Sequence, residues 1–153
     1  EIGKIAAPYM EKGEIVPDEI PIKLIADQIK ENTAADGFIF KGFPRTVIQA
    51  YILDGLLQRV NMKVSNMIEL KLSTLQAIKR LSSRGADDSK ARPYDLTTDM
   101  IVNRLEQYKE KTEPVINYYQ KQEKYSKINA DGTEQEVFNR LSEEIEQSLR
   151  KNF

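Results

Sequence analysis

Residues 36–50, DGFIFKGFPRTVIQA, are the stretch that decides the fold predicted from this sequence. The unbroken apolar run 38–40 is typical of a short strand covered on both faces of a parallel sheet. The Gly-Phe-Pro-Arg that follows predicts a tight turn, and Thr46 begins a helix that runs to about Arg59. Because ligands of open parallel sheets bind beyond the carboxyl ends of the strands, we expect this turn to present Arg45, with Lys41 nearby, to a ligand.

The rest of the chain alternates between helical and strand patterns. Apolar spacing and caps predict helices over residues 2–12, 18–31, 73–85, from Thr98, from Thr112 and after 131–133. In this reading Gly13 ends the first helix, Asp18 caps the second, Ser73 caps the helix that Gly85 ends, and Thr98 caps its own helix. Two more strands are predicted over 64–72 and 125–130, and a polar loop over 85–95. This alternation predicts an α/β protein with a parallel sheet.

The composition excludes several classes of function. The chain has 153 residues, with 23 Lys and Arg against 24 Asp and Glu, so it has no broad basic field for nucleic acid. No apolar stretch is long enough for a membrane span. It has no cysteine, which fits a cytoplasmic protein, and no histidine, so Ser-His-Asp triads, Cys-His dyads and ordinary zinc sites are excluded. Carboxylate, lysine, arginine and backbone chemistry remain.

Arginines recur at the ends of predicted elements and beside the polar loop. They are Arg45, Arg80, Arg84, Arg92 and Arg104. Any one of them suits a solvated helix face. Several together suggest guanidinium groups converging on phosphates, since their forked donors match phosphoryl oxygens.

Five ordered blocks carry a resemblance to a known family. GFIFKGFPRTVIQA resembles the core motif of the adenylate kinases, an apolar run followed by D-G-[FY]-P-R-[TE] and a later Gln. EIGKIAAPYMEKGEIVPDEI is similar to the end of the nucleotide-monophosphate subdomain, and RLSSRGADDSKARPYD is similar to the short lid. IVNRLEQYKEKTEPVINYYQ resembles the helix pair after the lid, and INADGT resembles the adenine-side loop.

The resemblance implies a P-loop-kinase-like fold, a parallel sheet flanked by helices. It divides the chain into the remainder of an AMP-binding subdomain (1–16), core (17–83), short lid (84–95) and core (96–153). The implied reaction is phosphoryl transfer between ATP and AMP to give two ADP, with Mg²⁺ entering with ATP rather than on a protein ligand of this chain. The short lid carries no zinc.

The resemblance also implies roles for individual residues. On the AMP side these are Glu14, Ile15, Val16, Gly42, Phe43, Pro44, Arg45, Gln49, Arg92 and Arg104. Gln49 would hydrogen-bond the adenine edge, and the Phe43–Pro44 peptide would be cis. On the ATP side they are Arg80, Arg84 and Gly132. The catalytic set would be Arg45, Arg84, Arg92 and Arg104.

Two features depart from the family pattern. No window of the sequence contains the P-loop, G-x-x-x-x-G-K-[ST], which family members carry ahead of the point where Glu1 begins. We therefore expect an incomplete chain that is inactive alone, with an open slot in its sheet, and hence a dimer, a swapped assembly or pairing with the missing segment. Lys41 stands where the family usually has an aspartate that helps to hold magnesium through water. The lysine either contacts a phosphate or is a tolerated substitution that extends to solvent.

Three other interpretations stay open at this stage. The chain suits a degenerate module that binds a nucleotide or a protein without turnover, which Lys41 and the missing P-loop favour. It also suits a UMP/CMP kinase, although Gln49 and GEIVP point toward AMP. In the third interpretation, the chain is a helical structural fragment, and its arginines are exposed to solvent and bind no ligand.

Overall fold

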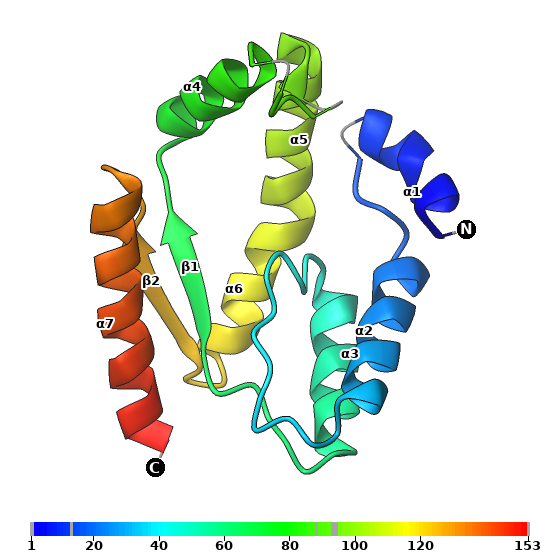
Figure 1. The fold of residues 1–153 in the computed structure, drawn as a ribbon, viewed down its shortest axis with the longest axis vertical. Helices are drawn as coiled ribbons and strands as arrows, with labels where there is room; N and C mark the ends of the chain where they lie inside the picture. Colours follow the sequence, from blue (N-terminus) through cyan, green and yellow to red (C-terminus); the bar gives the residue numbers. More distant parts are fainter. Residues whose placement is uncertain (1, 13, 88, 93–94, 153) are drawn as a thin grey trace.

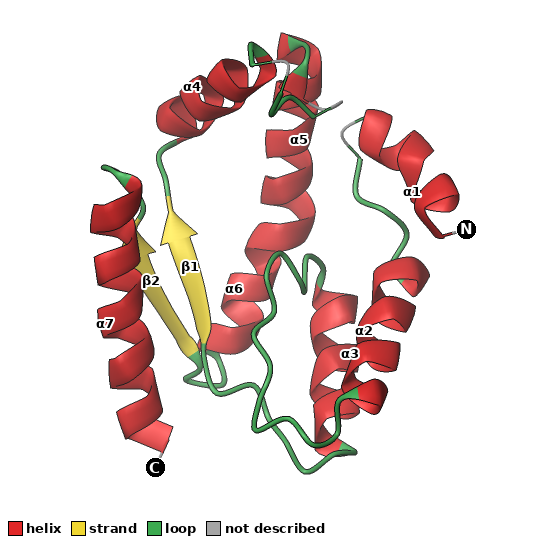
Figure 2. Ribbon diagram, in the orientation of Figure 1, coloured by secondary structure: helices red, strands yellow, loops and turns green. Residues whose placement is uncertain are grey.

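The computed structural model describes residues 2–12, 14–87, 89–92 and 95–152. A two-stranded parallel sheet of β1 (Met67–Lys71) and β2 (Tyr125–Asn129) lies beside a set of helices (Figures 1 and 2). Met67 stands opposite Tyr125, and Lys71 stands opposite Asn129. The α/β class and the parallel pairing predicted from the sequence are confirmed.

The helices follow the apolar patterns closely. They are α1 (Ile2–Glu11), α2 (Glu19–Glu31), α3 (Val47–Gln58), α4 (Thr74–Gly85), α5 (Thr98–Gln107), the π-helical turn η2 (Tyr108–Thr112), α6 (Glu113–Gln120) and α7 (Glu134–Asn152). Thr46 and Ser73 cap α3 and α4 as predicted, because each side chain accepts a hydrogen bond from the third backbone N–H that follows. The cap of α5 is Thr97, so the prediction of Thr98 was wrong by one residue. Gly13, predicted to end the first helix, lies outside the described residues.

Helices α6 and α7 contact the sheet, whereas α2 and α3 lie beyond α6. Helix α7 packs on β2, and α6 packs on both strands. Helices α2 and α3 pack against each other on the other side of α6, with α3 in contact with α6 (Figure 1). The core forms two clusters, one around Ile29, Leu53 and Leu57 and the other around Ala50, Val115 and Tyr119. Helix α3 contributes residues to both clusters, so the 42–45 turn that precedes it is attached to a helix anchored in both parts of the core.

The strand predicted over residues 38–40 was wrong. These residues form no ladder, and among the described residues β1 pairs only with β2. Phe38 and Phe40 turn to one side, with ring centroids 6.0 Å apart, and pack on the cluster of Ile29, Leu53 and Leu57, whereas Ile39 is 93% exposed. Burial against α2 and α3 therefore accounts for the two phenylalanines, and without a neighbouring strand the backbone forms no sheet.

Candidate functional site

The Gly42–Arg45 turn is held from within and from a distant element. Gly42 has a φ of 72°, which favours glycine, and its carbonyl accepts a hydrogen bond from Arg45 Nε at 2.7 Å. The Phe43–Pro44 peptide is cis, as the resemblance implied. Thr112, in the π turn, donates its hydroxyl to the Arg45 carbonyl at 2.9 Å. The turn thus has a defined shape before any ligand binds.

Gln49 lies behind this turn and is 1% exposed. Its Oε1 accepts a hydrogen bond from the Arg45 backbone N–H at 2.7 Å, and its Nε2 donates to Asp18 Oδ1, also at 2.7 Å. Thr46 Oγ1 donates to the same Asp18 oxygen at 3.0 Å. Asp18, predicted to cap α2, makes no side-chain cap bond there, because its carboxylate is committed to α3 instead.

A cleft of about 410 Å³ opens beside these residues. Its lining is largely apolar and comes from the segment before α2, from the start of α3 and from the π turn. The lining residues are Ile15, Val16, Pro17, Asp18, Thr46, Val47, Ile48 and Lys111. Glu14 is exposed next to the cleft, and its N–H donates to the Tyr9 carbonyl at 2.9 Å.

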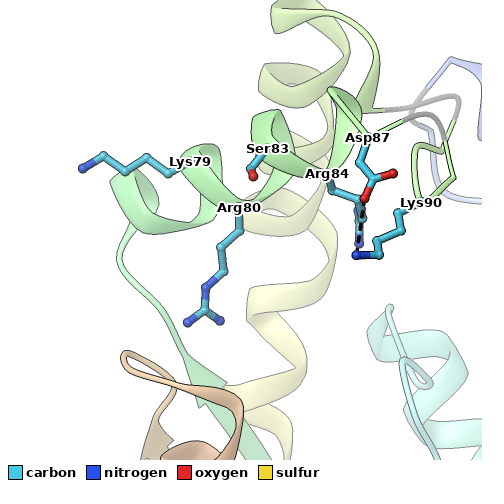
Figure 3. A pocket seen from close by; sticks show the side chains of 6 residues that line it. All are labelled: Lys79, Arg80, Ser83, Arg84, Asp87 and Lys90. Carbon is cyan, nitrogen blue, oxygen red and sulfur yellow. Dashed lines mark ion pairs between the residues drawn. The ribbon is translucent and has the colours of Figure 1, made fainter.

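A second cleft, also of about 410 Å³, lies along α4 and the segment that follows it (Figure 3). Four of its six lining residues are basic; the lining comprises Lys79, Arg80, Ser83, Arg84, Asp87 and Lys90. Asp87 forms an ion pair with Lys90 at 3.3 Å, and hydrogen bonds from Ser89, followed by one from Lys90, lower the pKa of the Asp87 carboxyl. This excess of positive charge suits an anionic ligand.

Arg84 forms a bidentate ion pair with a buried aspartate. Its Nε and Nη2 donate to the two carboxylate oxygens of Asp95 at 2.6 and 2.9 Å. The Asp95 side chain is fully buried and that of Arg84 is 30% exposed. The pair therefore closes the base of the segment that the resemblance identifies as the lid.

Arg80 points from α4 toward the loop that follows β2 (Figure 3). Its Nη2 donates to the carbonyls of Ala130 and Gly132, at 2.9 and 3.3 Å. From α7, Arg140 Nη1 donates to the carbonyls of Asn129 and Asp131, at 2.8 and 2.6 Å. Four consecutive carbonyls are thus bound alternately by two guanidinium groups.

The structure gathers the sequence-predicted residues into two places. Ile15 and Val16 line the first cleft, while Arg45 and Gln49 belong to the turn and helix beside it. Arg80 and Arg84 line the second cleft, with Gly132 held by Arg80. Arg92 is exposed on the segment after α4, and Arg104 is half-buried on α5. The two clefts share no lining residue, and the ligand roles of these residues remain predictions.

Several residues of these networks were not predicted from the sequence. Asp18 was interpreted only as a helix cap and Thr112 only as a helix start, and Asp95 and Arg140 were given no role. Asp95 alone had a partial signal, since the short-lid pattern R-G-x-x-S-G-R-x-D ends on an aspartate soon after an arginine, and Asp95 follows Arg92 at a slightly longer spacing. Arg140 lies on a charged helix face, where sequence spacing does not distinguish a bound guanidinium from a solvated one.

The residues that the structure describes contain neither a candidate metal site nor a candidate membrane span. The described ranges contain no group of three or more His, Cys, Asp or Glu residues that suits a metal ion. Across the same ranges, no helix has the length and hydropathy needed to cross a membrane.

Comparison with known proteins identifies the family. The adenylate kinase family model matches residues 1–124. The chain is 39% identical over 145 residues to the adenylate kinase of Flavobacterium psychrophilum and 37% identical over 145 residues to that of Parabacteroides distasonis; each match covers 95% of this chain and 75% of the relative. It is 40% identical over 129 residues to the adenylate kinase of a Caulobacter species, covering 84% of this chain and 67% of the relative. With a parallel sheet flanked by helices and the motif blocks in order, the chain belongs to the adenylate kinase family.

Proposed function

We propose that this chain provides the AMP side and the lid of an enzyme that transfers a phosphoryl group from ATP to AMP and yields two ADP. One observation carries the proposal: an apolar cleft opens at Thr46–Ile48, directly after the Gly42–Arg45 turn, and a separate basic cleft lies along α4 at Arg80 and Arg84. A phosphoryl-transfer enzyme of this kind needs two nucleotide sites, one for each substrate.

On the AMP side, the backbone of residues 14–16 lies along the adenine and the 42–45 turn holds the nucleotide. Arg45 binds the α-phosphate and Gln49 acts at the adenine edge. Arg92 and Arg104 bind the AMP phosphate and the transferring group. The apolar lining from Ile15 to Ile48 supports this assignment, because a planar base is bound mainly by apolar contact with a few placed polar groups.

On the ATP side, Arg84 binds the phosphates, Arg80 assists it, and Gly132 lies near the adenine. Arg84 donates two hydrogen bonds to Asp95, which holds its guanidinium in place, and the same side chain lines the basic cleft beside Arg80. Segment 84–95 acts as the lid between the core segments 17–83 and 96–153, and residues 1–16 belong to the AMP-binding part.

Phosphoryl transfer between two nucleotides requires the protein to position the substrates and to neutralise negative charge, and it requires no nucleophile from the protein. The phosphoryl oxygens gather negative charge as the group moves in line between the two nucleotides. Arginines from the lid and the core neutralise that charge and exclude water. Mg²⁺ would enter with ATP and would add positive charge that helps to neutralise its phosphates.

The P-loop is the part that these 153 residues do not supply. Its lysine and backbone amides cradle the β- and γ-phosphates, so we expect these residues alone to show negligible turnover. A coupled assay for ADP formation, with and without a separately added P-loop segment of a relative, tests this. Turnover at normal kinase rates without the added segment would contradict the expectation.

Binding is the test of the site itself. We expect calorimetry to detect AMP and, with higher affinity, a bisubstrate dinucleotide in which two adenosines are joined by phosphates. An Arg84→Ala variant should weaken the dinucleotide more than AMP, because only the dinucleotide reaches the basic cleft. A chain that binds neither compound would exclude the proposal.

A second candidate is a module that binds a nucleotide or a protein partner without turnover. Lys41 and the missing P-loop favour it. The two candidates differ in the assay with the added P-loop segment: an enzyme gains ADP formation, and a module that only binds does not.

A dimer or swapped assembly is also part of the proposal. Strand β1 is paired on one edge only within the described ranges, and an open strand edge invites pairing with another chain. Light scattering over a range of protein concentrations measures the expected self-association, and a monomer at every concentration would speak against it.

A further inference from the structure

The Asp18 carboxylate joins two segments that are far apart in the sequence. Asp18 has helical backbone angles (φ −56°, ψ −32°) at the start of α2, yet its side chain leaves that helix. Oδ1 accepts hydrogen bonds from Thr46 Oγ1 at 3.0 Å and from Gln49 Nε2 at 2.7 Å. Both donors bind the same oxygen, and Oδ2 has no hydrogen bond to any residue within the described ranges.

The orientation of the Gln49 amide is fixed by its two partners. An aspartate carboxylate only accepts hydrogen bonds, and the Arg45 backbone N–H only donates one. A flipped amide would place oxygen against oxygen at Asp18 and N–H against N–H at Arg45, leaving buried polar groups unsatisfied. Gln49 therefore holds Asp18 Oδ1 in place, and Oδ2 is the acceptor that Asp18 has to offer.

Asp18 lines the first cleft, whereas Gln49, directly behind it, does not. The lining contains five apolar residues, Ile15, Val16, Pro17, Val47 and Ile48. Its other members are Asp18, Thr46 and Lys111, and the Thr46 hydroxyl already donates to Asp18. A base that enters this cleft thus meets apolar walls and one carboxylate acceptor.

We infer that Asp18 is a specificity-determining residue, whose carboxylate accepts a hydrogen bond from the exocyclic amino group of adenine in the first cleft. The inference rests on the proposed function, in which this cleft holds AMP. A base without an amino group would cover Oδ2 and give it no donor, and a covered acceptor without a hydrogen bond is costly.

A purely structural role for Asp18 predicts a different result. If the carboxylate only ties the segment before α2 to α3, its loss weakens the binding of every monophosphate equally. If the carboxylate binds the amino group, its loss changes the ratio of the affinities for two nucleotides that differ in that group alone.

Calorimetry with two nucleotides separates these cases. The 153-residue chain is titrated with AMP and with purine riboside 5′-monophosphate, which lacks only the 6-amino group. We expect the unaltered chain to bind AMP about 10-fold or more tightly than its analogue, the usual effect of one hydrogen bond to a charged group. This comparison needs no variant, so it stands whatever a substitution does to folding.

The variant Asp18→Asn then tests the residue. An asparagine keeps its oxygen toward Thr46 and Gln49 and therefore presents an amide N–H₂ in place of Oδ2. We expect the preference for AMP to shrink to about twofold or less. Asp27→Asn, which makes the same charge change at an exposed position of α2, should keep the full preference.

Each outcome is informative. Equal affinity of the unaltered chain for both nucleotides overturns the inference and leaves the proposed function standing. An unchanged ratio in Asp18→Asn, or an equal loss of both affinities, assigns Asp18 a structural role and also overturns the inference. If neither nucleotide binds the unaltered chain, the proposed function fails and the inference fails with it.

Discussion

The hydroxyl of Tyr118 on α6 donates a hydrogen bond to the Asp54 carboxylate on α3 at 2.6 Å. Tyr119 and Gln122 also donate to Asp54, at 3.5 and 3.4 Å. Helix α3 begins directly after the 42–45 turn, and α6 begins directly after the π turn that holds the Arg45 carbonyl. The two helices are therefore fastened at one end by Asp54 and at the other by Thr112.

This contact predicts a loss of stability at alkaline pH. Burial, and then the hydrogen bond to Asp54, raise the pKa of Tyr118 from 10.0 to about 12. Because the unfolded tyrosine loses its proton first, the free energy of unfolding is unaffected below pH 10 and falls as pH rises toward 12. Burial raises the pKa of Tyr119 and of Tyr125 in the same direction. Urea unfolding at several pH values between 8 and 11 measures the slope.

Tyr118→Phe should reduce that alkaline slope. Below pH 10 it should cost about 1 kcal/mol, because Asp54 loses its shortest hydrogen bond. Tyr9→Phe on α1 serves as the control and should leave the slope unchanged. An identical slope in Tyr118→Phe and the unaltered chain would show that Tyr118 does not contribute to it.

Removing the charge of Asp95 should destabilise the lid base. Asp95→Asn keeps the shape but leaves Arg84 without its carboxylate in a largely buried place, at a cost of about 2–3 kcal/mol, less than for a fully buried pair since Arg84 is partly exposed. Thermal unfolding measures the change. Asp99→Asn, on the exposed side of α5, is the matched control and should shift the midpoint little. Equal midpoints for the two variants would contradict this prediction.

Gly85 is needed because the chain passes close to it. A Cβ at this position would overlap the backbone carbonyl oxygen of Asp95. Gly85→Ala should therefore cost about 1–3 kcal/mol by forcing the 84–95 segment outward. Gly55→Ala on α3, where a Cβ meets open space, should instead be neutral or stabilising. The two variants are compared by urea unfolding, and similar effects at both sites would refute the steric argument.

Lys41 should affect how nucleotide binding depends on magnesium. The family motif usually has an aspartate at this position, and an exposed lysine repels a divalent cation. Lys41→Asp changes the local charge by two units, so we expect it to strengthen the Mg²⁺ dependence of bisubstrate binding by at least about fivefold, the effect of a single near charge in water. Lys63→Asp, at another exposed lysine, is the control. If magnesium acts equally on both variants, position 41 plays no part in handling the metal.

Most elements could be predicted from the sequence because their signals are local. The caps Thr46 and Ser73 and the apolar faces of the helices depend on residues within one or two turns. Residues 38–40 show the limit: their composition favours a strand, but a strand also needs a hydrogen-bonding neighbour. The two phenylalanines found apolar partners on α2 and α3 instead, and Ile39 stayed in solvent.

The candidate site was predictable only in part for the same reason. The sequence marks which arginines and glycines match the family motif, and the structure shows what holds them. Asp18 meets Gln49 across 31 positions, and Arg84 meets Asp95 across a loop. Such pairs depend on tertiary packing, and spacing along the chain gives no indication of them.

Arg80 on α4 and Arg140 on α7 donate hydrogen bonds to alternate carbonyls of residues 129–132. These bonds connect α4 to α7 through the loop that follows β2. Arg80 lies one helical turn before Arg84 on α4. A rotation of α4 that displaced Arg84 would therefore also displace the Arg80 guanidinium, which binds the carbonyls of Ala130 and Gly132. Arg140 holds the other two carbonyls to α7, which packs on β2. A displacement of α4 would therefore be transmitted to the loop after β2, which Arg140 ties to α7.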